Sequence, residues 1–403
     1  MSTALMLNLP EAGHMNPCFP LLVALRQRGE HVICYGVEPF RSAIEEAGAE
    51  YRGYPNPQAL IPPAHTGGLF SVMAFMGRAT EAILPSLLAE IRTIKPDYLL
   101  IDSMSMWGGL VQQVLQIPAI TISSVFVTYP KMPTELMIRM NYERLPKEML
   151  LNGIDALHSY FEISQRLDHQ YGTQSPNIVG AFSNAQPLNI LFTSQDFHPG
   201  GEVFYEDHYK FVGPSVGLRA EAIGFLFAQL SGAPLVYISL GTIFNERPDF
   251  YNACFAAFAD TPFQVVMAIG DKVDPATLAT PPDNFIVRPA VPQLEILQRA
   301  ALFITHGGMN STSEGLLYGV PLIVVPQHGD QFIVASRVVD VGAGLMLPAA
   351  QAVPAALKGM AMQVLSTPSF KERAQAMSRS LQAGGGPQRA ADEIVAYTKK
   401  LVG

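Results

Sequence analysis

HGGMNSTSEGLLYGVPLIVVPQHGDQ, residues 306–331, is the stretch of this chain that decides its fold. It follows an apolar run at 301–305 (ALFIT) that is typical of a buried parallel strand. The glycine pair at 307–308 predicts a tight turn, and the polar residues 310–312 suit the first turn of a helix. A strand, a glycine turn and a helix N-terminus together form an anion site, because free backbone N–H groups and the positive end of the helix dipole point at one place.

A second polar cluster follows the next strand-like run, 322–325 (LIVV). Pro326 ends that run, and residues 327–331 (QHGDQ) carry side chains that can hydrogen-bond to hydroxyl groups. A phosphate site and a hydroxyl-binding cluster are therefore expected at the ends of successive strands. A nucleotide-sugar site requires this layout.

The length and composition indicate a large α/β protein. At 403 residues the chain is too long for one ordinary core, so we expect two domains of roughly 200 residues each. Its residues are 49% hydrophobic and 15% charged, which favours large buried sheets. The formal charge of −8, without a run of Lys or Arg, argues against nucleic acid as a partner.

Other features of the composition favour the cytoplasm. The three cysteines are scattered without metal-ligand spacing, which fits a reduced compartment. Residues 1–10 lack the basic start and long apolar core of a signal peptide and are interpreted as the first strand. No uninterrupted apolar run approaches the ~18 residues of a membrane span. We therefore expect a cytoplasmic protein without a transmembrane segment, present as a monomer or weak dimer.

Strand-like runs alternate with helical stretches along the chain, as in doubly wound parallel sheets. In the first half we predict helices at 20–28 and 39–47 and strands at 4–9, 31–35, 98–101 and 119–123. In the second half we predict helices at 249–259 and 293–300 and strands at 235–240, 263–269, 285–288 and 302–305. The repeated pattern predicts two similar domains with a ligand site between them.

The domain boundary is expected just after FVGPS, residues 211–215. The predicted parts are a domain at 1–212, a linker at 213–219, a second domain at 220–385 and a C-terminal helix at 386–403. Within the first domain, residues 129–171 have helical spacing without clear strands. This segment either lines an adaptable apolar pocket or consists of ordinary core-facing helices, and its methionines include Met132, Met137, Met140 and Met149.

Two side chains of the first domain are candidates for proton transfer. His14 follows the first predicted strand, at the edge of a parallel sheet where ligands bind. Histidine takes protons near neutral pH, although a single histidine is often structural. Asp102 ends another strand-like run. It either fixes the His14 tautomer, as the third member of a catalytic triad does, or caps the helix expected from Met106.

Two further segments of the second domain are candidate ligand contacts. Residues 239–242 (SLGT) repeat the strand-and-turn arrangement and are able to reach a diphosphate, although such turns are frequent without a ligand. Residues 288–293 (RPAVPQ) place backbone groups and Gln293 near a base or ribose. Alternatively, this segment is a proline-rich turn that opens a helix at Pro292.

With these motifs the chain resembles the family 1 inverting glycosyltransferases, and within them the bacterial macrolide-glycosyltransferase-like group. The resemblance runs along the whole chain, and its most specific part is the 306–331 block. The other motifs that carry it are GHMNP (13–17), FVGPS (211–215), SLGT (239–242) and VPQLEIL (291–297). It implies an α/β chain of the GT-B fold, with two Rossmann-like domains facing a central cleft. The acceptor would bind to the first domain and the nucleotide sugar mainly to the second, with the C-terminal helix crossing back onto the first.

The resemblance also implies a role for each matching residue. His14 resembles the general base and Asp102 its partner. The implied donor contacts are His306 to the α-phosphate, Gly308, Asn310 and Ser311 to the diphosphate, Glu314 to the ribose, Asp330 and Gln331 to the sugar, and Gln293 with the Val291 backbone to the base and ribose. The remaining donor-binding candidates are Gly13, Ser239, Gly241, Thr242 and Arg288.

One position departs from the family pattern. Ala290 stands where the family commonly has an aromatic residue that stacks on the base, a contact worth roughly 1–3 kcal/mol in nucleic-acid complexes. Its loss opens the pocket to other bases or leaves Arg288 to cover the ring. UDP-glucose is the expected donor, and a TDP-sugar used in natural-product biosynthesis is the alternative.

The expected reaction is transfer of a hexose to a hydroxyl of a small hydrophobic acceptor such as a macrolide, a flavonoid or other polyphenol, or a terpenoid. Natural-product glycosylation or antibiotic resistance would follow. No metal and no cofactor besides the nucleotide sugar is expected. A non-catalytic nucleotide-sugar-binding protein is the competing class. An NAD-dependent oxidoreductase is disfavoured because the loop after the first strand, PEAGHMNP, lacks the Gly-x-Gly-x-x-Gly pattern.

Overall fold

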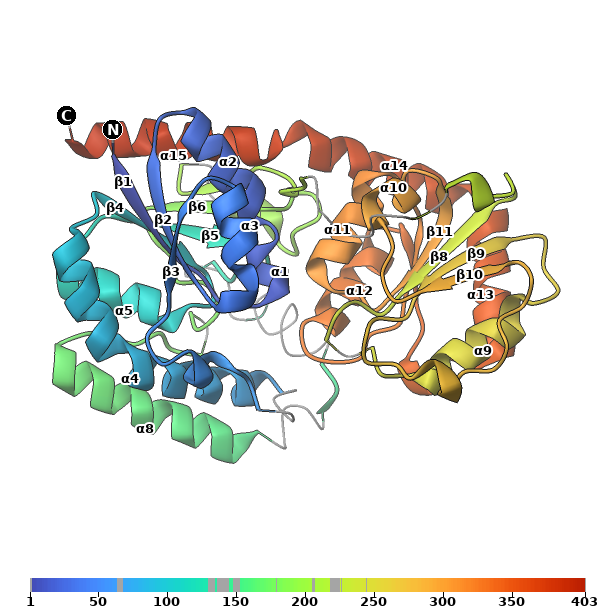
Figure 1. Ribbon diagram of the computed structural model, residues 1–403, viewed down its shortest axis with the longest axis horizontal. Helices are drawn as coiled ribbons and strands as arrows, with labels where there is room; N and C mark the ends of the chain where they lie inside the picture. The colour runs from blue at the N-terminus through green and yellow to red at the C-terminus, as the bar shows by residue number, and fades with distance from the viewer. Residues whose placement is uncertain are drawn as a thin grey trace. The chain divides into compact units, whose positions relative to one another are not determined.

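The computed structural model describes residues 2–402 apart from 64–67, 130–134, 136–144, 148–152, 179, 205–206, 218–224, 226 and 244. The chain divides into two compact units, Met1–Gly217 with Ala383–Gly403, and Leu218–Gln382. Each unit contains its own parallel sheet (Figure 1). The methionines of the predicted apolar pocket lie outside the described residues, whereas the end of that segment forms helix α8 (Ile154–Tyr171).

The described strands of the first unit form a parallel sheet in the order β3-β2-β1-β4-β5-β6-β7. Because the chain moves outward from β1 in one direction and restarts at β4 in the other, the switch point lies between β1 and β4. Ligands bind at the carboxyl ends of the strands on either side of such a point. The strands are β1 (Thr3–Leu7), β2 (His31–Gly36), β3 (Glu50–Gly53), β4 (Tyr98–Asp102), β5 (Ala119–Ser123), β6 (Leu188–Leu191) and β7 (Tyr209–Phe211).

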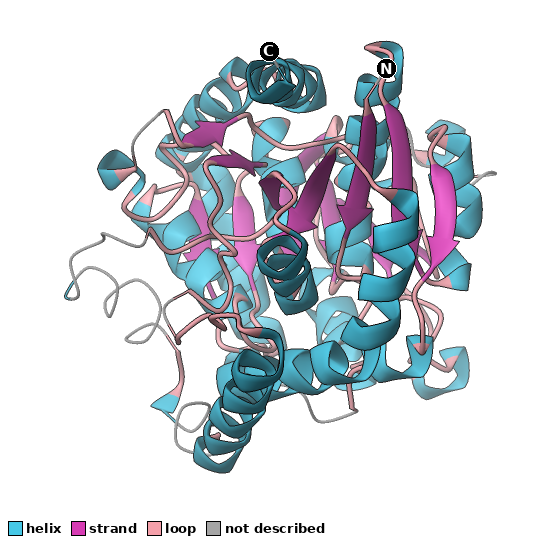
Figure 2. Ribbon diagram, turned by 90° about the vertical axis from the view of Figure 1, so that its left-hand side faces the viewer, coloured by secondary structure: helices cyan, strands magenta, loops and turns pink. Residues whose placement is uncertain are grey.

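Helices cover both faces of this sheet (Figures 1 and 2). Alternate side chains of β1 enter opposite cores, since Leu5 and Leu7 pack with α4, α5 and α8, whereas Ala4 and Met6 pack with α2, α3 and α15. The described helices of this unit are α1 (Ala12–Met15), α2 (Cys18–Gln27), α3 (Arg41–Glu46), α4 (Leu69–Ile94), α5 (Met106–Leu115), α8 and α15 (Gly386–Val402), with short 3₁₀ turns at Glu38–Phe40, Pro57–Leu60 and Gly201–Val203.

Helix α4 is the one helix among the described residues that is long and apolar enough, by length and composition, to cross a membrane. Within its most apolar window, 61% is buried inside the structure. Its inner side chains, among them Ile83, Leu84 and Leu87, belong to the core that β1 shares with α5 and α8. Packing inside the first unit therefore accounts for the apolar character of α4.

The C-terminal helix α15 is part of the first unit. Ala390, Ala391 and Ile394 are buried in the core beneath α2. At the rim of this contact, the Arg28 guanidinium donates to Asp392 Oδ1 at 2.7 Å and to Gln388 Oε1 at 2.9 Å. The chain thus returns to the first sheet after completing the second unit (Figure 1).

The described strands of the second unit form a parallel sheet in the order β10-β9-β8-β11-β12-β13, with its switch point between β8 and β11. The strands are β8 (Leu235–Ser239), β9 (Gln264–Ala268), β10 (Phe285–Arg288), β11 (Ala300–Thr305), β12 (Leu322–Val324) and β13 (Gly344–Met346). Its helices are α9 (Pro248–Phe258), α10 (Gln293–Leu297), α11 (Met309–Leu317), α12 (Gln331–Asp340), α13 (Pro354–Ser366) and α14 (Pro368–Ala383). The 3₁₀ turns lie at Phe227–Gln229, Pro275–Thr277 and Ala349–Gln351.

Candidate active site

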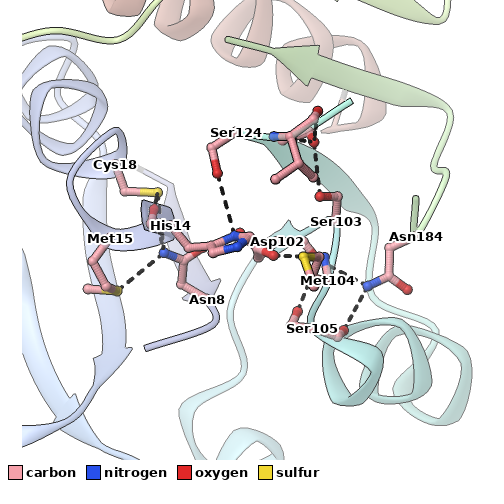
Figure 3. A network of polar contacts seen from close by, with 12 residues as sticks. Asn8, His14, Met15, Cys18, Asp102, Ser103, Met104, Ser105, Ser124 and Asn184 are labelled. Carbon is pink, nitrogen blue, oxygen red and sulfur yellow. Dashed lines mark hydrogen bonds and ion pairs between the residues drawn. The ribbon is translucent and has the colours of Figure 1, made fainter. Parts of the chain in front are cut away.

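The first unit places His14 and Asp102 together at its switch point (Figure 3). His14 lies in α1, just beyond β1, and Asp102 is the last residue of β4. His14 Nδ1 is 2.8 Å from Asp102 Oδ2, and the side chains are only 10% and 2% exposed. An ionised carboxylate only accepts hydrogen bonds, so with Asp102 ionised Nδ1 carries the hydrogen and Nε2 is the nitrogen placed to act as a base.

The second oxygen of Asp102 holds the turn after β4. Met104 N–H donates to Asp102 Oδ1 at 2.7 Å. Helix α5 begins after Ser105, whose side chain makes no capping hydrogen bond. Asp102 therefore does not cap α5 directly, and its two oxygens divide between a local turn and the His14 ring.

A buried network fixes the backbone beneath His14. Asn8 Nδ2 donates to the His14 carbonyl at 3.0 Å, and Tyr54 OH donates to the Asn8 carbonyl at 2.7 Å. Trp107 Nε1 in turn donates to Tyr54 OH at 3.1 Å. The sequence reasoning missed this network, although a buried Asn directly after an apolar strand is a signal for it.

Asn184 holds Asp102 from the other side (Figure 3). Its Nδ2 donates to the carbonyls of Asp102 at 3.0 Å and Ser105 at 2.7 Å. The residue has a φ of 41°, in the left-handed region that Asn tolerates better than most residues. Ser124 Oγ also lies 3.5 Å from His14 Nδ1. Neither Asn184 nor Ser124 was predicted: Asn184 lies in a loop outside the predicted elements, and Ser124 directly follows the strand predicted at 119–123 but belongs to no distinctive motif.

In the second unit, glycines bring the backbone close to the His306 ring. Gly241 has a φ of +76°, and a Cβ built there would lie 2.5 Å from His306 Cε1. A Cβ on Gly308, the N-cap of α11, would lie 2.3 Å from His306 Nε2. The turns predicted after β8 and β11 therefore meet around one imidazole, at the N-terminus of α11. Only glycine fits both positions without displacement of that ring.

The His306 imidazole is neutral at physiological pH. Burial lowers its pKa from 6.5 to about 4, and the Ser239 backbone carbonyl, which accepts a hydrogen bond from the ring, acts in the opposite direction. A neutral ring that donates one hydrogen to a carbonyl keeps its other nitrogen as an acceptor.

This pKa predicts a pH dependence of stability. The unfolded chain binds a proton at His306 near pH 6.5 and the folded chain only near pH 4, so the contribution of neutral His306 is complete above pH 6.5 and is lost as the pH falls toward 4. Relative to His306→Gln, wild type should lose about 2–3 kcal/mol of unfolding free energy between pH 7 and roughly 4.5. Urea unfolding of both proteins at the two pH values measures this difference, and parallel profiles would contradict it.

Glu314 and Gln293 are in direct contact. Glu314 lies in α11 and is 2% exposed, and Gln293 Nε2 donates to its Oε2 at 2.6 Å. Gln293, together with the Val291 backbone, was predicted to contact the base and ribose. Its amide also donates to the carboxylate that was predicted to bind the ribose.

Gln331, the first residue of α12, is buried and bonded to its own loop. Its Oε1 accepts from Gln327 N–H at 2.8 Å and from His328 N–H at 3.2 Å. Its amide oxygen is therefore committed to this loop, and its amide hydrogens are the groups able to donate to another acceptor. Asp330 beside it is exposed.

The other predicted donor contacts differ in exposure. Asn310 and Ser311 are partly buried in the first turn of α11, whereas the Val291 side chain and Ser239 are buried. Ala290 is exposed, and the side chain of Arg288 donates to the neighbouring Val287 carbonyl at 2.8 Å. Besides Asp330, the exposed candidates are Gly13 in the first unit and Thr242 and Arg288 in the second. Within the described parts of the chain, no group of three or more His, Cys, Asp or Glu residues has an arrangement that would hold a metal ion.

Comparisons with known proteins agree with this two-sheet architecture. Residues 253–397 match the family model described as erythromycin biosynthesis protein CIII-like, C-terminal domain. NDP-glycosyltransferase YjiC of Bacillus licheniformis is 37% identical over 401 residues, covering 97% of this chain and 96% of the relative. The uncharacterized UDP-glucosyltransferase YojK of Bacillus subtilis is 33% identical over 408 residues, covering 99% and 98%. The solved glycosyltransferase of kitacinnamycin has a TM-score of 0.84 at 28% identity, covering 98% of each chain.

Two Rossmann-like parallel sheets, together with the similarity to these glycosyltransferases, define this protein as a glycosyltransferase of the GT-B fold. The chain belongs to the family 1 glycosyltransferases, in their bacterial macrolide-glycosyltransferase-like group. The fold class and family expected from the sequence are thereby confirmed.

Proposed function

We propose that this protein is an inverting glycosyltransferase that transfers glucose from UDP-glucose to a hydroxyl of a small hydrophobic acceptor. The observation that carries the proposal is the buried His14–Asp102 pair, 2.8 Å apart at the switch point of the first sheet. A histidine oriented by a carboxylate is the arrangement that removes a proton from a hydroxyl nucleophile. A protein that only binds nucleotide sugars has no use for this pair.

The reaction is a direct displacement at the anomeric carbon. His14 Nε2 takes the proton of the acceptor hydroxyl, and the acceptor oxygen bonds to the sugar carbon from the face opposite the nucleotide. The bond from that carbon to the diphosphate oxygen breaks, and its electron pair leaves with the diphosphate. An α-linked donor therefore gives a β-linked product.

The donor is assigned to the second unit. We propose that backbone N–H groups at the start of α11 and the hydroxyl of Ser311 stabilise the charge that grows on the diphosphate, in place of a divalent metal. His306 contacts the α-phosphate, Glu314 the ribose, and Asp330 with the Gln331 amide the sugar. The name of the relative YojK, a UDP-glucosyltransferase, supports UDP-glucose as the donor. The exposed Ala290 supports a TDP-sugar as the second candidate.

Incubation of the protein with UDP-glucose and a flavonoid tests the proposal. We expect a product heavier than the flavonoid by one hexose residue in mass spectrometry, and a β-anomeric proton in its NMR spectrum. A parallel reaction with TDP-glucose separates the two donors, and a reaction without flavonoid measures hydrolysis. Tight UDP-glucose binding without transfer to flavonoid, macrolide or terpenoid alcohol would instead favour the binding-protein alternative.

A further inference from the structure

A chain of two hydrogen bonds links the second sheet to Glu314. Tyr237 in β8 donates from its hydroxyl to Gln293 Oε1 at 2.9 Å. Gln293, the first residue of α10, donates from Nε2 to Glu314 Oε2 at 2.6 Å. Side chains from β8 and α10 are thus linked in series to Glu314 in α11, the carboxylate that we assign to the ribose. Tyr237 belongs to none of the motifs that suggested the site.

The Tyr237 hydroxyl has a fixed position. The residue is 1% exposed, and it pairs with Phe303 across strands β8 and β11. The two rings stack with centroids 4.7 Å apart and planes 13° apart. Burial and stacking hold the ring in place, so its hydroxyl acts as an anchor.

This anchor sets the orientation of the Gln293 amide. The carboxylate of Glu314 only accepts hydrogen bonds, so Gln293 must turn its NH₂ group toward it. The Tyr237 hydroxyl donates to the opposite end of the amide and stabilises this orientation. Without the hydroxyl, the partly buried amide oxygen loses this donor and Gln293 gains freedom to rotate away from Glu314.

We propose that Tyr237 is a positioning residue that, through Gln293, orients Glu314 toward the ribose and so makes the site prefer ribonucleotides to 2′-deoxyribonucleotides. The inference rests on the proposed donor function of the second unit. A carboxylate held in one orientation accepts a hydrogen bond from the 2′-hydroxyl with good geometry. A mobile carboxylate distinguishes poorly between a nucleotide that has this hydroxyl and one that lacks it. A site built to bond a hydroxyl discriminates strongly against the analogue that lacks it.

Isothermal titration calorimetry with UDP and 2′-deoxy-UDP tests this role without an acceptor. Wild type should bind UDP roughly ten- to a hundredfold more tightly than 2′-deoxy-UDP, because a hydroxyl bonded to a carboxylate is lost. In Tyr237→Phe we expect the ratio of the two Kd values to fall by about three- to tenfold, mainly through weaker UDP binding. Tyr98→Phe is the matched control, since Tyr98 is also buried on a strand and donates to a carboxylate, Glu30, at 2.9 Å in the first unit.

A double-mutant cycle tests whether Tyr237 acts through Gln293. Gln293→Ala should lower the ratio at least as far as Tyr237→Phe, and adding Tyr237→Phe to it should change the ratio by less than twofold, since additivity fails for residues in one hydrogen-bond network. If the Kd ratio in Tyr237→Phe equals that of wild type, including the case in which the binding of both ligands weakens by the same factor, the role of Tyr237 is overturned while the proposed donor function stands. Wild type that binds both ligands equally overturns it together with the ribose role of Glu314. Wild type that binds neither ligand overturns the donor proposal as well.

Discussion

His14→Ala is expected to lower kcat by about 10²–10⁴-fold, the usual contribution of a general base, with little change in the Kd for UDP. The substitution removes the ring whose Nε2 takes the acceptor proton, and it leaves the second unit, to which the donor is assigned, unaltered. Initial rates with UDP-glucose and the acceptor found by mass spectrometry give kcat. Calorimetry gives the Kd for UDP.

His31→Ala is the matched control for this substitution. His31 also lies in the first unit and faces a carboxylate, since its Nε2 is 3.5 Å from Glu50 Oε2, but both side chains are exposed. Its loss should leave kcat within about twofold, as expected for an exposed side chain outside the site. A His14→Ala enzyme with turnover near that of wild type would exclude His14 as the base. A loss of UDP binding equal to the loss of kcat would assign it to the donor instead.

The parts of the fold that could be predicted are those with a local signal. The segment from β11 through the glycine turn to α11 combines an apolar run, two glycines and a polar first turn within a short stretch, and all three elements form where expected. The strands that were missed are short, and three of them lie at sheet edges. In β3 the residues Glu50–Gly53 are mostly polar, because an edge strand buries little of its surface.

Strand β6 was missed for a different reason. It lies inside the sheet, but Asn189 interrupts its apolar pattern. The Asn189 amide is buried and donates to the carbonyls of Gln186 and His208, so its polarity is satisfied by loops whose positions no local pattern reveals. Tertiary partners thus make a polar residue acceptable in a strand.

The site was predictable where topology alone brings residues together. His14 and Asp102 are far apart in sequence, yet His14 follows β1 and Asp102 ends β4, and the switch point places these neighbouring strand ends side by side. The contact between Gln293 and Glu314 in the second unit was not predictable in this way. Those two side chains meet through the packing of helices α10 and α11, which no local sequence pattern reveals. Gln331 shows the same limit, because its contact with its own loop depends on how that loop folds.

Asp102→Asn is expected to lower kcat by about 10²–10⁴-fold while the fold is preserved, as for the corresponding change in a Ser-His-Asp triad. The turn after β4 determines how the new amide faces. Met104 N–H needs an acceptor, so the Asn oxygen should take the place of Asp102 Oδ1 and keep that 2.7 Å bond. The NH₂ group then faces His14 Nδ1 in place of Oδ2.

That orientation reverses the His14 tautomer. An NH₂ group donates, so Nδ1 becomes the acceptor and the ring hydrogen moves to Nε2, which then cannot take a proton from the substrate. ¹⁵N NMR of the imidazole should show this exchange, and the melting temperature should change by only a few degrees. Asp97→Asn is the control, because Asp97 Oδ2 also accepts a backbone N–H, from Thr3 at 2.7 Å, but lies just before the start of β4. Retention of wild-type kcat in Asp102→Asn, with the tautomer reversed, would show that His14 does not act as the base through Nε2.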